Sequence, residues 1–359
     1  LGDVYKRQAL EMEKIMGEIM QEHVDRLMML GTLSADEFTE LLRYRNAETT
    51  EYLFQKAEEV RKQQFDKEVY LWGRLPFSNY CKNDCNYCGL RRSNRFVKRY
   101  RMNMKEILQY CHEGYRQGIR NFLLESGTDF YFSEANFAEI VDAVHKHFPD
   151  CTIILNVGDH TKAAYLHWMH LGAGAAMLSH DASNELQFKR LHSANMSLLR
   201  RKQGMWELQE MGYHTGTGFL VGTPYQTIEN VSEDLLFMKQ FMPQMIQIAP
   251  FLAAKHTPFE RERGGNADMV LYLMAIARLM FRGSILIADP SLEQAMHDGR
   301  KKALQAGANA VVVDIVDEAL RGAYAVYDEH TIHRQQETIK SFEQQIREKG
   351  YEVVRKAIM

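Results

Sequence analysis

Three of the chain's five cysteines lie close together, as Cys81, Cys85 and Cys88 in a CxxxCxxC spacing. Three thiolates can hold three irons of a [4Fe–4S] cluster and leave the fourth iron open to a substrate or cofactor. A disulfide framework fits less well, because it needs an even number of cysteines and is typical of short secreted chains. Structural zinc prefers four ligands, and ferredoxin-type clusters use four cysteines. The spacing therefore predicts one cluster with an open iron.

Length and charge narrow the functional classes. The chain has 359 residues, of which 45% are hydrophobic, enough for a barrel of about 250 residues with extensions. Its net charge of −3 argues against a nucleic-acid partner, because nucleic-acid-binding domains are usually basic. No apolar run reaches the roughly 18–20 residues of a membrane span, and we expect no signal peptide. Free cysteines and an oxygen-sensitive cluster fit a reducing cytoplasm.

The elements that must position the cysteines alternate between short apolar runs and helical patterns, which predicts βα units. Eight such units favour a (β/α)8 barrel of the TIM type over an open doubly wound sheet. The predicted strands are 69–77, 121–125, 152–156, 175–178, 217–221, 245–249, 285–288 and 310–313. The predicted helices are 105–117, 136–147, 162–171, 199–211, 228–241, 267–280 and 295–305.

Segments on either side of the barrel look helical. We predict an N-terminal helical extension at 9–66, a barrel at 67–317 and a short helical C-terminal tail at 318–359. In the extension, Ser34 and Glu37 have the spacing of a capping box. Residues 1–8 resemble translated adapter sequence, and we assign them no role.

Polar residues gather where the predicted strands end, and this is where such barrels place their function. Each has a simpler explanation. Tight turns account equally well for Gly127 and Gly158. A helix N-cap is the more typical role for Asp159, and a lone histidine such as His180 is more often packed or solvated than a ligand. The full set is Glu125–Asp129, Asn156–Asp159, Ser179–Asp181, Gly222–Thr223, Pro250, Asp289, Asp314 and Asp317.

Aromatic and basic residues surround the cysteines. The ring of Tyr87 could lie against a flat ligand such as adenine or pack the loop against the barrel. Four arginines follow, and they could balance thiolate charge or be solvated: Arg91, Arg92, Arg99 and Arg101.

The segment Phe77–Arg92 resembles the radical S-adenosylmethionine (SAM) superfamily, and within it the [FeFe]-hydrogenase maturases of the HydE type and the biotin synthase branch. Segments at 98–102, 212–213, 221–227 and 233–237 fit the same pattern. The resemblance implies that SAM binds the open iron and that the reduced cluster cleaves it to methionine and a 5′-deoxyadenosyl radical. The radical would act on a small-molecule substrate. An electron donor such as ferredoxin or flavodoxin, and other maturation proteins, are the partners it implies.

The resemblance also implies roles for individual residues, although it assigns no catalytic residue. For Arg201 an exposed helix position is the alternative, and Arg200 competes for its role. By position, Cys81, Cys85 and Cys88 would bind the cluster, Tyr87 would contact adenine, Ser126 and Gly127 would lie along the methionine moiety, Asp181 would hold a polar group of SAM, and Arg201 would pair with the SAM carboxylate.

The sequence departs from the maturase pattern around the unchanged cysteine motif. Thr128 stands where an acidic residue is typical, Ser179 replaces an arginine, and Asp289 lies in place of a threonine-rich stretch. No cysteine follows Cys151, so we predict no second cluster. Three hypotheses remain: a maturase-type enzyme, a paralogue with another substrate, and a non-enzymatic iron–sulfur protein. The paralogue could be an amino-acid mutase like 3-methylornithine synthase or a biotin synthase-like sulfur-chemistry enzyme.

Overall fold

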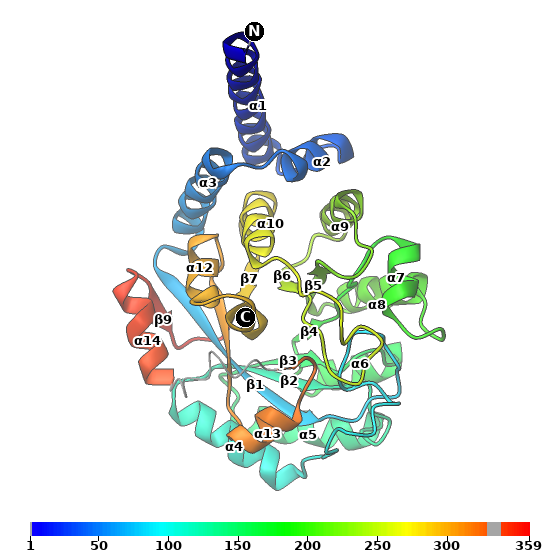
Figure 1. Ribbon diagram of the computed structural model, residues 1–359. Coiled ribbons are helices and arrows are strands. Elements are labelled where there is room, and N and C mark those ends of the chain that lie inside the picture. The colour runs from blue at the N-terminus through cyan, green and yellow to red at the C-terminus, as the bar shows by residue number, and fades with distance from the viewer. Residues whose placement is uncertain (1, 329–338) are drawn as a thin grey trace.

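Eight parallel strands close into a barrel in the computed structural model (Figure 1), which describes residues 2–328 and 339–359. The strand order runs from β2 to β8 and then β1, and β1 also pairs with β2. This closure confirms the predicted (β/α)8 barrel; the open sheet is wrong. The strands are β1 (Glu68–Ser78), β2 (Asn121–Ser126), β3 (Thr152–Asn156), β4 (Ala175–Met177), β5 (His214–Val221), β6 (Met245–Pro250), β7 (Ile285–Ala288) and β8 (Ala310–Asp314).

Helices surround the barrel, close to their predicted positions. The predicted helix 295–305 is instead two helices, because Asp298 adopts a left-handed backbone with φ of 57°. The short helix α7 was not predicted. The helices after β1 are α4 (Met104–Arg116), α5 (Glu134–His147), α6 (Lys162–His170), α7 (Glu185–Leu191), α8 (Leu198–Glu210), α9 (Ile228–Phe241), α10 (Ala267–Met280), α11 (Pro290–Ala295), α12 (Gly299–Gln305) and α13 (Glu318–Ala323).

The barrel interior changes from apolar to polar along its axis. Side chains from seven strands, among them Trp72, Leu123 and Val312, form an apolar cluster inside it. Because strand side chains alternate between two faces, the residues two positions further on face the same interior. These residues are Arg74, Glu125, Asn156, Ser179, Gln247, Asp289 and Asp314. The carboxyl end of the barrel is thus lined with groups that can bind polar ligands.

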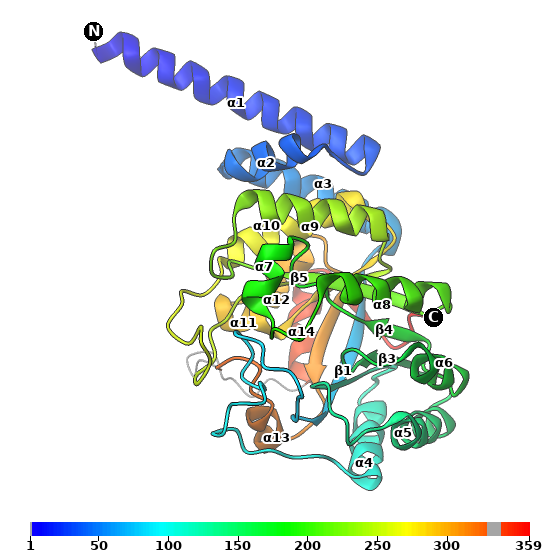
Figure 2. The ribbon, with the colours of Figure 1, turned by 90° about the vertical axis from the view of Figure 1, so that its right-hand side faces the viewer.

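Three helices precede the barrel: α1 (Gly2–Leu30), α2 (Ala35–Arg43) and α3 (Ala47–Phe65). The predicted capping box at Ser34 and Glu37 is present. These helices pack on α9 and α10, which leaves α10 buried along almost its whole length. The outer part of α1 projects away from the barrel (Figure 2).

The C-terminal tail is not purely helical. After α14 (Ile339–Glu348), the short strand β9 (Glu352–Val354) pairs with the start of β1. The Asn121 amide then donates to the Lys356 carbonyl (3.1 Å) and accepts from the Ile358 backbone N–H (2.9 Å). The last part of the tail, residues 339–359, therefore lies at the amino end of the barrel. Figure 2 shows the C-terminus opposite the loop that follows β1.

Candidate active site

The cysteines lie in a loop, residues 79–103, that leaves the carboxyl end of β1. Asn79 is fully buried and fixes both ends of this loop: its amide donates to the Lys98 carbonyl (2.9 Å), and its side-chain oxygen accepts from the Tyr100 N–H (2.8 Å). The Arg99 guanidinium donates to four backbone carbonyls, those of Asn79, Leu90, Arg91 and Asn94. A loop without regular secondary structure is thus held in one conformation.

The three thiols are free and close to one another, with Cys85 buried and the other two half-buried. Burial raises the pKa of Cys85 to about 12, and the neighbouring Cys81 would oppose a further negative charge. Burial and both neighbouring thiols also raise the pKa of Cys88. Thiolates here need compensating cations, which a cluster of iron ions supplies. Within the described residues no three His, Cys, Asp or Glu side chains are placed to share one metal ion.

The end of β2 supports the cysteine loop by close backbone approach. A Cβ on Gly127 would lie 2.3 Å from the Tyr80 carbonyl oxygen and 2.7 Å from the Cys81 Cβ. Gly127 does not have a positive φ, so close approach and not a tight turn explains this glycine. Gly158 differs, because its φ is +78°. The Lys82 N–H donates to the Thr128 carbonyl (2.9 Å), which places Ser126–Thr128 against the cysteines.

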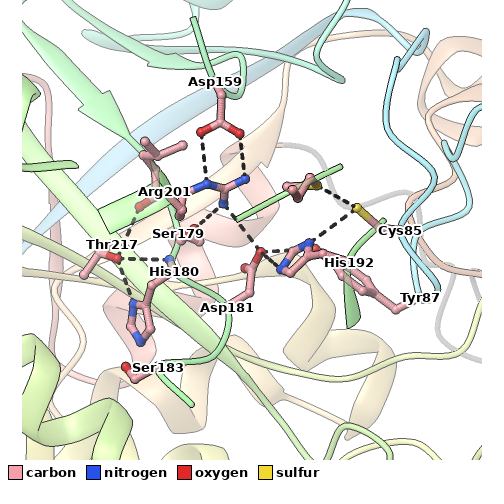
Figure 3. A network of polar contacts seen from close by, with 12 residues as sticks. Cys85, Tyr87, Asp159, Ser179, His180, Asp181, Ser183, His192, Arg201 and Thr217 are labelled. Atoms are coloured by element: carbon pink, nitrogen blue, oxygen red, sulfur yellow. Dashed lines mark hydrogen bonds and ion pairs between the residues drawn. The ribbon is translucent and has the colours of Figure 1, made fainter. Parts of the chain in front are cut away.

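A polar network connects the cysteine loop to the strand ends (Figure 3). At its centre, the Asp181 carboxylate accepts from the Tyr87 hydroxyl (3.2 Å) and lies 3.3 Å from His192 Nε2. The other ring nitrogen, His192 Nδ1, lies 3.4 Å from Cys85 Sγ. His192 is almost fully buried. The imidazole thus joins a predicted cluster ligand to a predicted SAM-binding carboxylate.

Arg201 extends the network from α8. Its side chain is buried, so the alternative prediction, that Arg201 is an exposed helix residue, is wrong. Its guanidinium donates to both oxygens of Asp159 (3.0 Å each), donates to the Ser179 carbonyl, and lies 3.7 Å from Asp181. The competing Arg200 is exposed. Asp159 is not the N-cap of α6, because Thr161 has that position; ion pairing with Arg201 is its structural role.

These contacts fix the charges at the network. Burial alone would raise the pKa of Asp181, but the hydrogen bond and charge of His192, with the charge of Arg201, hold it below its ordinary value. Asp159 and Asp181 outweigh burial to raise the pKa of Arg201. The site therefore presents a carboxylate and a guanidinium side by side.

A second polar cluster lies inside the barrel. The Arg74 guanidinium donates to both oxygens of Asp314 (2.7 and 3.1 Å) and lies 3.8 Å from Glu125. The Asn156 amide donates to Glu125 Oε1 (2.8 Å), whereas Oε2 has no hydrogen-bond partner among the described residues. Burial raises the pKa of Glu125 to about 7, despite the opposing charge of Arg74. The Gln247 amide donates to Asp289, which also caps α11.

A cavity of about 240 Å³ opens beside the polar network. The cysteine loop contributes Lys82 and Asn83 to its wall, the loop after β3 contributes Asp159, and α8 contributes Arg201. Of the residues predicted to bind the cluster or SAM, Arg201 therefore borders this cavity, whose other walls come from the neighbouring loops and from α8.

Sequence reasoning missed two residues of the site and was right about the simpler role of a third. His180 packs in the core, where its ring Nδ1 is hydrogen-bonded to the Thr217 hydroxyl (3.0 Å) and its Nε2 lies near Asp234. His192 was missed because it follows the unpredicted α7. Arg74 was missed within β1, although an arginine in an apolar run is a signal of a buried ionic contact.

Comparison with known proteins identifies the family. The family model of the radical SAM superfamily matches residues 75–238. The [FeFe] hydrogenase maturase subunit HydE of Thermotoga maritima is 31% identical over 304 residues, which are 83% of this chain and 86% of that relative. The chain belongs to the radical SAM superfamily. Proteins of this superfamily use a [4Fe–4S] cluster and SAM, and the three free thiols of this member, one buried and two half-buried, suit the cluster.

Other relatives resemble this radical SAM protein along nearly its whole length. The 3-methylornithine synthase of Methanosarcina acetivorans is 28% identical and covers 95% of this chain and 96% of its own. The crystal structure of a methylornithine synthase superposes with a TM-score of 0.83 at 27% identity, covering 92% of this chain and 97% of that chain. A structure of the maturase HydG has the same fold, with a TM-score of 0.79 at 17% identity. No helix within the described residues is long and apolar enough to cross a membrane.

Proposed function

We propose that this radical SAM enzyme resembles the HydE-type maturases in cleaving SAM reductively and directing the product radical at a small substrate in the barrel. The supporting observation is the three free thiols beside the Tyr87–Asp181–Arg201 network. When bound, the reduced cluster supplies the electron that cleaves the C–S bond of SAM to methionine and a 5′-deoxyadenosyl radical. The chain's own residues hold, orient and desolvate the reactants.

Each residue of the network has a proposed role. Cys81, Cys85 and Cys88 are the cluster ligands. The ring of Tyr87 contacts adenine, while its hydroxyl is held by Asp181. Arg201 pairs with the SAM carboxylate, and Asp159 orients the guanidinium by its two-pronged contact. Asp181 binds a polar group of SAM, and Ser126 and Gly127 lie along its methionine moiety.

The substrate would meet the polar interior of the barrel. There, the carboxyl groups of Glu125, Asp289 and Asp314 share the interior with one guanidinium, that of Arg74, which is already paired with Asp314. This excess of carboxyl groups suits a substrate with an ammonium group. It favours a second candidate function, an amino-acid mutase like the 3-methylornithine synthases to which the chain is similar.

The partners follow from the chemistry. A reductive cleavage needs a low-potential electron donor, and we propose a ferredoxin or flavodoxin. If the substrate is that of the maturases, other maturation proteins are partners as well. Neighbouring genes for a hydrogenase and its maturases would support this assignment.

The decisive experiment is anaerobic reconstitution followed by addition of SAM and dithionite. Wild-type protein should form 5′-deoxyadenosine, and Cys85→Ala should form none. Cys151→Ala is the matched control, because this buried cysteine lies outside the loop and its loss should leave the product. If wild type forms no product and shows no spectral change with SAM, both enzyme proposals are wrong. That result would support the hypothesis of a non-enzymatic iron–sulfur protein.

The two substrate classes can be separated with the same assay. Lysine and ornithine carry a side-chain ammonium, whereas glutamate is the control with the opposite side-chain charge. A mutase should form 5′-deoxyadenosine faster with a diamino acid than with glutamate, and the increase should fall in Asp289→Asn. Equal rates with all three amino acids would contradict the mutase proposal.

A further inference from the structure

The loop continues past the last cysteine as a rigid segment on the surface, Arg92–Lys98. Buried Asn94 organises it: the amide donates to the Gly89 carbonyl (2.9 Å), and the side-chain oxygen accepts from the Phe96 N–H (3.1 Å). Figure 2 shows this cyan loop along the side of the molecule away from the C-terminus. Its backbone is fixed from within, so its outward side chains have defined positions.

The outward side chains are basic and aromatic. Phe96 is 76% exposed, and its ring stacks on exposed His256, with centroids 3.9 Å apart. This stacking brings the loop after β6 beside the cysteine loop. We call the exposed group the basic patch; it consists of Arg92, Arg95, Phe96, Lys98 and Lys255.

The cations of the basic patch differ from the other arginines of the loop. Arg91 pairs with Asp84 (2.8 Å), and Arg101 pairs with Asp129 (2.7 Å). Within residues 2–328 and 339–359, by contrast, the four patch cations have no carboxylate at ion-pair distance. Because the chain as a whole carries a net charge of −3, this positive charge is a local feature.

We propose that the basic patch docks a small acidic electron-carrier protein; this rests on the proposed function. Exposed positive charge on a fixed frame steers an oppositely charged partner, and an exposed aromatic ring gives the contact an apolar centre. The patch begins four residues after Cys88, so the docked carrier lies beside the cluster loop. One electron passes from the carrier's reduced flavin or iron–sulfur centre to the cluster, which oxidises the carrier and reduces the cluster by one electron each.

Comparing two electron sources, dithionite and reduced flavodoxin, separates an effect on carrier docking from an effect on SAM cleavage. The test variant combines Arg92→Glu, Arg95→Glu and Lys98→Glu. The matched control makes the same charge change on and just after α14, at three exposed cations: Lys340, Arg347 and Lys349. Formation of 5′-deoxyadenosine is measured with dithionite and, separately, with reduced flavodoxin over a range of flavodoxin and salt concentrations.

With flavodoxin at low salt, the patch variant should lose at least about tenfold in kcat/KM for the carrier, whereas the control variant should match wild type. With dithionite, all three proteins should react alike. High salt should weaken the wild-type reaction with flavodoxin and remove its advantage over the variant.

Equal flavodoxin kinetics in the patch and control variants would overturn the docking proposal, as would an equal loss with dithionite, which would indicate damage to the cluster loop. Failure of wild type with dithionite would instead overturn the proposed function, so the two failures can be told apart.

Discussion

Replacing Glu125 by glutamine should remove a pH dependence from the protein's stability. Glu125 lies inside the barrel, and burial raises its pKa from 4.5 to about 7. The folded protein therefore binds this proton more tightly than the unfolded chain does, so ionisation of Glu125 opposes folding. The stabilising contribution of the protonated Glu125 carboxyl is complete below pH 4.5 and is lost as the pH rises through 7.

The size of the effect follows from the two pKa values. One pKa unit corresponds to about 1.36 kcal/mol, so full ionisation of Glu125 costs about 3 kcal/mol of unfolding free energy. Between pH 5 and pH 8, the stability of wild type relative to Glu125→Gln should fall by about 2.5 kcal/mol. The glutamine retains an oxygen that can accept from Asn156, which limits other effects of the substitution.

Urea unfolding at pH 5, 6, 7 and 8 would measure this difference. Glu139→Gln on the exposed face of α5 is the control, and its difference from wild type should stay constant with pH. A constant difference for Glu125→Gln would refute the reasoning. So would a wild type that gains stability over the variant as the pH rises, because the carboxyl would then be ionised in the folded state.

Three further changes test the site. Arg201→Lys should weaken SAM binding about 10–100-fold, measured by anaerobic equilibrium dialysis, because charge-assisted hydrogen bonds contribute about 1.5–3 kcal/mol; unchanged affinity would contradict its role. Gly127→Ala should lower the iron bound per chain after reconstitution, whereas Gly204→Ala, whose added Cβ meets only a 3.6 Å contact, should not. His192→Asn should shift the cluster's reduction potential, measured by redox titration, to more negative values, because hydrogen bonds to the sulfurs tune it. An unchanged potential would mean that the contact with Cys85 is lost once the cluster binds.

The sequence allowed the barrel to be predicted because its buried strands are short apolar runs, each followed by a helical pattern. The first three cysteines were also predictable, since their spacing is local. The short tail strand β9 was not, because three residues carry too little periodicity. The division between α11 and α12 depends on a single left-handed residue, Asp298.

The polar network was only partly predictable, because its contacts depend on the path of the chain in three dimensions. Asp159 stands two residues before a helix N-cap, and an N-cap and an ion-pair partner have the same local pattern. The contact between Cys85 and His192 joins residues 107 apart. No local propensity encodes such a contact, so the structure was needed to find it.

The position of β1 in the barrel has a consequence for how the chain folds. Tyr70 of β1 pairs with Ala310 of β8. The barrel therefore cannot close until β8, far along the chain, is available to pair with the first strand. Such distant pairing slows folding. The same closure brings Arg74 to Asp314, and a strand that docked one residue out of register would break this ion pair. The ion pair thus penalises misregistered closure.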